Sequence, residues 1–162
     1  MRESSIFSRR FAAGALLVLL AGIIQSSGIA AVGGVRPNIL LVLLLTLVFF
    51  FREWKSYAAL IAIATIFSKT EIGFSSPYIV IAIISACVFL VKPHFPGHRF
   101  FNVILAVIAG TIITYVITDL KFLGNDPFTV MIEVVYNVLV GIVVYLLAER
   151  IIGNETEFRT SR

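Results

Sequence analysis

Glu133 is the one ionisable residue that lies well inside a long apolar block of this sequence. A charged group at the centre of a membrane-spanning helix costs about 2.5–3.5 kcal/mol on insertion scales, so such residues are candidates for function. Asn137 and Gly141 follow at intervals of four, which places all three residues on one face of a helix. This face could form a helix contact or line a ligand, or Glu133 could lie near enough to the membrane surface to reach water.

A second group of small and polar residues lies in the apolar block at 100–118. Ala106 and Gly110 form a pair of small residues spaced by four, which lets a second helix approach closely. Three threonines share a neighbouring face of the same helix: Thr111, Thr114 and Thr118. Threonine hydroxyls on helices often bond to carbonyls of their own helix, so this face is typical of helix packing.

Residues that could support catalysis or bind a metal are sparse. His94 and His98 are spaced by four, but Pro96 and Gly97 between them prevent a helix, and no third ligand is close in the sequence. Cys87 has no second cysteine with which to form an internal disulfide. Motifs for a nucleophilic serine, a zinc protease or a phosphate-binding loop do not occur. The sequence therefore predicts no catalytic residue, no cofactor site and no metal site.

The composition indicates that membrane helices position these residues. Apolar residues make up 59% of the chain and charged residues 14%, with a mean hydropathy of +1.02. Soluble domains average about 45–50% apolar and about 25% charged residues. These values exclude a soluble enzyme, a disordered tail and a disulfide-rich secreted domain. The net charge of +4 does not indicate nucleic-acid binding, because no basic cluster with interleaved aromatic residues occurs outside the apolar blocks.

Six apolar blocks divide the chain, so we expect an all-α, polytopic integral membrane protein with six transmembrane helices in one domain. The predicted spans are residues 11–31, 38–51, 54–68, 77–91, 100–118 and 128–148, and a polar tail follows at 149–162. The first block also has features of a secretory signal, with a conceivable cleavage site at 28–30. We expect the segment at 119–127 to be a turn.

The second and third blocks are each short for a membrane span. A re-entrant pair is one explanation, and a tight helical hairpin is the one we favour. In the hairpin, Arg52 and Lys55 extend to the membrane surface while Trp54 and Tyr57 lie at the headgroup level. Pro37 is expected to be the first residue of the second helix, where its missing N–H has no partner to lose.

The distribution of basic residues supports the hairpin. With six spans and a cytoplasmic N-terminus, ten of the 13 Lys and Arg residues lie on the cytoplasmic side. The three on the outer side are Arg36, Lys69 and Lys121. Cytoplasmic loops are enriched in Lys and Arg, so this asymmetry favours six spans with both termini in the cytoplasm. Merging the second and third blocks would move Lys92 and Arg99 outside and weaken the asymmetry.

A small set of residues resembles a known family. The segment Arg36-Pro37-Asn38, followed directly by a run of Ile, Leu and Val, resembles the start of the second span in the MreD family of rod shape-determining membrane proteins. The pair Ile72-Gly73, Asn137 in the last span and the terminal Arg150 also fit this family. The likeness covers most of the chain but depends on few residues.

The resemblance implies a non-enzymatic scaffold of the bacterial cell-wall elongation machinery in the cytoplasmic membrane. Its implied partners are an MreC-like single-span protein, the MreB filament, a RodA-type glycosyltransferase and its transpeptidase, together with membrane lipid. We expect the MreC-like helix to contact the fifth span at Ala106, Gly110 and Thr114. The implied fold is similar to the six-helix substrate-binding subunits of energy-coupling-factor transporters. A vitamin-binding subunit of such a transporter is therefore the alternative function.

Overall fold

The regular structure of this chain is helical. The computed structural model describes residues 3–29, 31, 35–67 and 76–153, and within these ranges every regular element is a helix. The α-helices are α1 (Glu3–Ser27), α2 (Ile39–Val48), α3 (Trp54–Phe67), α4 (Ser76–Val91), α5 (Arg99–Thr118), α6 (Leu120–Asn125) and α7 (Pro127–Ile152), and the 3₁₀ helix η1 is Lys92–His94. The expectation of an all-α chain is therefore confirmed for the described residues. Ile72-Gly73 and the end of the polar tail, 154–162, lie outside them.

Within the described ranges, four helical segments are long and apolar enough to cross a membrane: Arg9–Ser27, Pro77–His94, Arg99–Thr118 and Pro127–Ile152. By contrast, α2 has 10 residues and α3 has 14. At about 1.5 Å per residue, α2 is about 15 Å long, roughly half of a hydrocarbon core about 30 Å thick. The structure thus supports a multi-pass helical membrane protein, whereas six full-length spans are not confirmed.

The short helix α2 lies at the centre of the bundle. All of its residues are buried, and it packs against α1, α3, α4, α5 and α7. The surrounding helices expose large apolar side chains outward, including Leu20, Leu105 and Leu139. An apolar outer surface around an apolar core is the pattern expected where lipid replaces water as the solvent.

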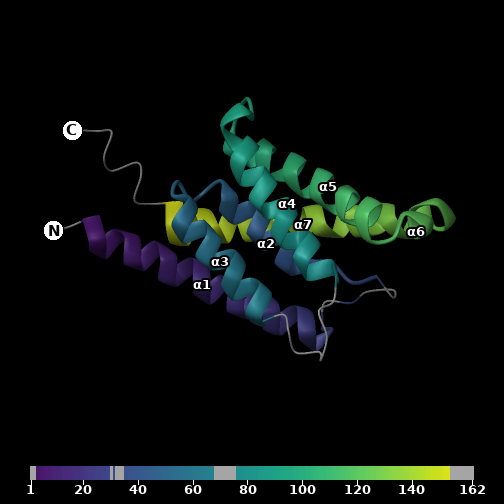
Figure 1. The fold of residues 1–162 in the computed structure, drawn as a ribbon, viewed down its shortest axis with the longest axis horizontal. Coiled ribbons are helices and arrows are strands. Elements are labelled where there is room, and N and C mark those ends of the chain that lie inside the picture. The colour runs from purple at the N-terminus through teal and green to yellow at the C-terminus, as the bar shows by residue number, and fades with distance from the viewer. Residues whose placement is uncertain (1–2, 30, 32–34, 68–75, 154–162) are drawn as a thin grey trace.

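The helices alternate in direction between two ends of the bundle. Gln25, near the end of α1, contacts the start of α2, and Lys92, after α4, contacts the end of α2. Figure 1 shows that α1 begins and α7 ends on the same side of the molecule. It also shows the hairpin of α5, α6 and α7 extending past the other helices on the opposite side. We call residues 112–136 the distal arm; Val130 is the one buried side chain among those described there.

The second apolar block forms a shorter helix than the predicted span at 38–51. Helix α2 ends at Val48, and 49–51 leave it through a turn in which Phe50 and Phe51 donate N–H bonds back to the Leu47 carbonyl. Pro37 is not the first helical residue, because Asn38 caps the helix and Ile39 begins it. Pro37 instead accepts a hydrogen bond from the Ile39 N–H at 3.1 Å.

Three further boundaries differ from the prediction. The predicted turn at 119–127 contains the short helix α6, capped by Asp119. The last helix continues past 148 to Ile152, so the first residues of the predicted polar tail are helical. The first helix ends at Ser27, where Gly28 adopts a φ of 69°. Glycine adopts this left-handed conformation without steric cost, which ends the helix.

Candidate functional site

The N-terminal end of α2 is held by polar groups from two other helices. The cap and first three residues of a helix have N–H groups without a partner in the helical ladder. Here the Asn38 N–H donates to Asn137 Oδ1 at 2.8 Å, and the Leu40 N–H donates to Gln25 Oε1 at 2.8 Å. The Leu41 N–H donates to Asn38 Oδ1 at 3.1 Å. With the Ile39 bond to Pro37, all four groups are satisfied, which lets a helix end lie inside an apolar bundle.

Asn137 is the centre of this network. Its side chain is fully buried, and its Nδ2 donates to Thr111 Oγ1 at 3.0 Å while its Oδ1 accepts from the Asn38 N–H. Thr111 donates in turn to the Val107 carbonyl at 2.8 Å. One amide thereby connects α7, α5 and the cap of α2. The structure also brings together Asn38 and Asn137, which lie 99 residues apart.

Glu133 extends the network toward the distal arm. The Tyr115 hydroxyl donates to Glu133 Oε2, and the Asn137 amide interacts with the same carboxyl group. Tyr115 also stacks on Phe122 in α6, with the ring centroids 5.8 Å apart. Glu133 is partly buried. Its partners are neutral, and it forms no ion pair with any residue that the structure describes.

Lys92 holds the other end of α2. Its Nζ donates to the carbonyls of Val48 at 3.2 Å and Phe51 at 2.5 Å, and it lies 3.6 Å from the centroid of the Phe89 ring. A positive charge at the C-terminal end of a helix is favourable because the last carbonyls carry partial negative charge. The sequence pattern predicts only a loop cation at this position, since nothing in it links Lys92 to α2.

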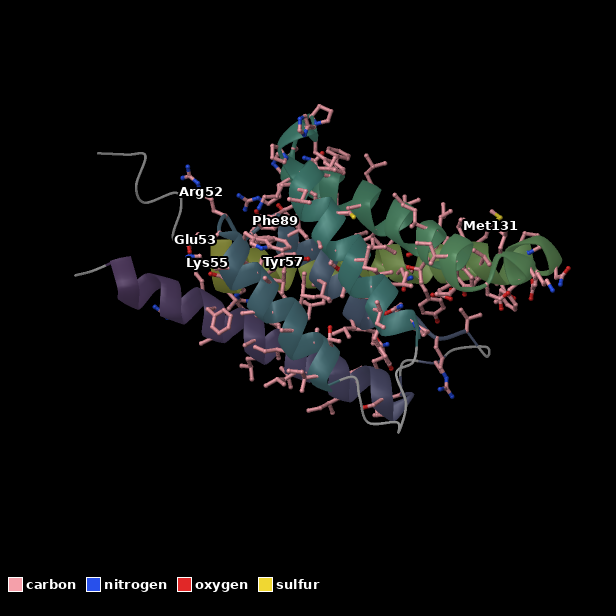
Figure 2. The ribbon with its side chains drawn as sticks, viewed as in Figure 1. Arg52, Glu53, Lys55, Tyr57, Phe89 and Met131 are labelled. Carbon is pink, nitrogen blue, oxygen red and sulfur yellow. The ribbon has the colours of Figure 1, made fainter. Side chains whose placement is uncertain are left out.

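An aromatic cluster of Trp54, Tyr57 and Phe89 lies next to Lys92. The Tyr57 hydroxyl donates to the Leu44 carbonyl at 3.0 Å, and the Tyr57 and Phe89 rings stack with centroids 5.1 Å apart. Trp54 lies against both rings. Figure 2 shows Tyr57 and Phe89 side by side, close to Arg52 and Lys55 around the start of α3. These contacts connect α3 and α4 to the same end of α2.

One of the small residues of α5, Gly110, faces α2 of the same chain. Ala106 is buried, and a Cβ added to Gly110 would lie 2.5 Å from Leu45 Cδ1. A Cβ added to Gly141 on α7 would lie 3.5 Å from Val42 Cγ1 of α2 and 3.5 Å from Val107 Cγ2 of α5, which is an ordinary contact distance. Leu45 of α2 occupies the surface beside Gly110, so this glycine packs within the chain, and the expected contact of a partner helix with Ala106 stays a prediction. Hydropathy and spacing cannot distinguish these two uses of a small-residue pair.

The remaining predicted residues occupy varied positions. The Thr114 hydroxyl donates to the Gly110 carbonyl at 2.8 Å, within its own helix. Arg36 is exposed and Pro37 is buried beside the network. His98 caps α5, accepting through Nδ1 from the Phe100 N–H at 3.3 Å. Across the described ranges, no group of three or more His, Cys, Asp or Glu side chains could hold a metal ion.

Comparison with known proteins does not assign this chain to a family. No family model, no curated protein and no solved structure matches it. Its geometry and the short sequence segments described above therefore carry the functional argument.

Proposed function

We propose that this protein is a non-enzymatic scaffold of the bacterial cell-wall elongation machinery, related to the MreD family. The observation that carries the proposal is the hydrogen bond from the Asn38 N–H to Asn137 Oδ1. Asn38 ends the Arg36-Pro37-Asn38 segment and Asn137 lies in the last span, and the resemblance depends on both. Since these distant residues form one structural unit, a shared fold explains their occurrence together better than chance similarity of two short segments.

The chemistry of the network favours helix packing over catalysis. Its side chains bond to one another or to helix termini, as Gln25 and Asn137 do at α2. Interhelical hydrogen bonds of this kind join membrane helices and contribute about 0.6 kcal/mol each on average. A protein built in this way acts through its surfaces, and we propose an MreC-like single-span protein as the direct partner. The MreB filament, a RodA-type glycosyltransferase and its transpeptidase are further proposed members of the assembly.

The alternation of the helices supports the proposed orientation in the membrane. The end of the bundle where α2 terminates carries most of the described basic residues: Arg9, Arg10, Arg52, Lys55, Lys92, Arg99 and Arg150. Arg36 and Lys121 lie toward the other end. Because Lys and Arg are enriched on the cytoplasmic side of membrane proteins, we propose the bacterial cytoplasmic membrane with both termini in the cytoplasm.

The alternative is a vitamin-binding subunit of an energy-coupling-factor transporter. Such a subunit needs a pocket open to the outside, lined with polar groups for a small molecule. Here α2 fills the centre of the bundle with apolar side chains. The Asn137 side chain is already hydrogen-bonded to the Asn38 N–H and to Thr111. This arrangement favours the scaffold over the vitamin-binding subunit.

Depletion of the protein in its native host tests the proposal. The scaffold predicts that rod-shaped cells become round as the protein is lost, and that re-expression of the wild-type chain restores rods. Uptake of vitamins should be unchanged. Cells that keep their shape while losing uptake of a vitamin would contradict the scaffold and support the transporter subunit.

A further inference from the structure

The distal arm is a surface that the other described helices leave uncovered. Deeper in the bundle, α5 and α7 are covered by α2, up to Thr111 on α5 and Asn137 on α7. Beyond these residues both helices expose large apolar side chains, including Ile117 at 56%, Met131 at 67% and Val135 at 59%. Figure 2 shows Met131 on this arm, well separated from Arg52, Glu53 and Lys55 at the opposite end.

Within this arm lies an acid that lacks a basic partner. Glu133 is six residues inside the start of α7 at Pro127, which is about 9 Å along the helix. Its carboxyl group contacts the neutral groups of Tyr115 and Asn137. Acids inside a membrane usually pair with a base or face a water-filled cavity. Among the described residues no ion pair forms with Glu133, which leaves this carboxyl group available to a base from another molecule.

The surroundings of Glu133 limit what that molecule can be. Val116 and Ile117, next to Tyr115 in the sequence, and Val135, two residues after Glu133, are apolar and exposed, so the occupant of the arm must itself be stable within the membrane. The hydroxyls of Thr114 and Thr118 already donate to carbonyls of α5, so these donors are not needed to bind the occupant. A membrane-spanning helix with one basic side chain meets both conditions.

We propose that the distal arm binds the transmembrane helix of the partner protein, and that this helix carries a Lys or Arg that pairs with Glu133. The inference rests on the proposed function for the existence of an MreC-like partner. The position of the partner helix on the arm and its basic residue are inferred from the structure. This surface differs from the face of α5 at Gly110, where Leu45 of α2 lies.

Site-specific cross-linking tests the surface. The full chain is produced in its host together with the MreC-like protein, with a photoreactive residue at Val116 or Val135 on the arm. Matched controls carry it at Leu16 on α1 and Leu90 on α4, which are also exposed apolar positions. We expect cross-links to the partner from the arm positions and few from the controls. Equal cross-linking from both sets, or stronger cross-linking from the controls, would overturn the assignment.

Substitution of Glu133 tests the charge. Glu133→Gln preserves size and can still accept the Tyr115 hydrogen bond, so the isolated chain should keep its thermal stability. Co-purification of the MreC-like protein should fall at least about tenfold, because breaking a desolvated ion pair costs more than 1.4 kcal/mol. Glu53→Gln, at the opposite end of the bundle, should have no effect. Glu133→Lys should also block binding, and exchange of the partner's base for Glu should restore it.

The outcomes separate this inference from the proposed function. If the wild-type chain retains no MreC-like protein, the proposed function and the inference both fail. If the wild type retains it and Glu133→Gln does so equally well, the charge pairing alone fails. If Glu133→Gln destabilises the isolated chain, the carboxylate serves the N-terminal end of α2 and the assignment to a partner is wrong.

Discussion

Asn137 joins three helices through one side chain, so its loss should affect the whole bundle. Asn137→Leu would leave the Asn38 N–H and the Thr111 hydroxyl without their present partner. An unsatisfied buried donor costs about 1–3 kcal/mol, while single interhelical hydrogen bonds in membranes reach about 1.7 kcal/mol. We expect a loss of about 1–2 kcal/mol, measured as a lower midpoint of thermal unfolding in detergent. The control Val143→Leu changes an exposed residue of the same helix, and an equal effect of both variants would contradict the role of Asn137.

Lys92 should stabilise the bundle through the end of α2. Lys92→Met keeps the length and apolar contacts of the side chain but removes the donor to the Val48 and Phe51 carbonyls. Hydrogen bonds to charged groups contribute about 1.5–3 kcal/mol, so we expect a loss in that range in the same unfolding assay. Lys55→Met, at an exposed position, serves as the control. If Lys92→Met unfolds at the wild-type temperature, the hydrogen bonds of Lys92 to the end of α2 do not stabilise the protein.

At the residue scale, the sequence indicates one of the two residues in several polar contacts but not the partner of that residue. Asn137 and Glu133 are recognisable because they interrupt an apolar block, and helical spacing places them on one face. Their partners could not be predicted, since Thr111, Tyr115 and the Asn38 backbone come from other segments. Lys92 gives no signal at all, because a basic residue beside prolines is typical of an exposed loop.

At the scale of elements, α2 shows why hydropathy overestimates helix length. Phe49, Phe50 and Phe51 are as apolar as the helix before them, yet they form the turn that ends it. Apolar turns occur where buried backbone groups find other partners, and here Lys92 supplies them for Val48 and Phe51. The order and approximate limits of the other long helices follow from the sequence because polar residues, proline and glycine separate them.

Close packing of α5 against α2 should make Gly110 intolerant of a side chain. In Gly110→Ala the new Cβ would lie 2.5 Å from Leu45 Cδ1 in a fully buried contact. Overpacking of this kind costs about 1–3 kcal/mol. Gly22→Ala on α1 is the matched control because nothing lies within 4 Å of its added Cβ. It should be neutral or stabilising by up to about 1 kcal/mol, and a similar loss in both variants would contradict this packing.

Asp126 caps α7 and should make the stability of the arm depend on pH. The Thr129 hydroxyl donates to its carboxylate at 2.6 Å and the Thr129 N–H donates at 3.1 Å. These bonds hold the pKa of Asp126 below its usual value. A lowered folded-state pKa stabilises the protein above the unfolded-state pKa, about 3.9, and this contribution is lost as pH falls through the folded value.

The measurement is the thermal midpoint between neutral pH and pH 3 for the wild type and for Asp126→Asn. The variant retains an N-cap side chain, so it should be close to wild type at low pH and less stable near neutrality. An identical acid dependence in both proteins would show that Asp126 contributes nothing through its charge.

At the scale of the whole molecule, the fold combines helices of very different length in one bundle. The helices α5 and α7 have 20 and 26 residues, whereas α2 has 10. A short central helix is possible because polar side chains satisfy both of its ends inside the bundle. The difference in length also leaves the distal arm uncovered, so the packing of α2 and the surface proposed for a partner have the same structural origin.

The most direct test of the proposed scaffold is the direction in which each segment crosses the membrane. Single cysteines are introduced at Arg36, Arg52, Gly97 and Lys121 in a Cys87→Ser background, and cells are treated with a membrane-impermeant thiol reagent. Cysteines introduced at positions 36 and 121 should react in intact cells. Cysteines introduced at positions 52 and 97 should react only after the cytoplasmic membrane is opened. Reaction of Arg52 and Lys121 from the same side would contradict the alternating arrangement of six helical segments and the orientation that the proposed function requires.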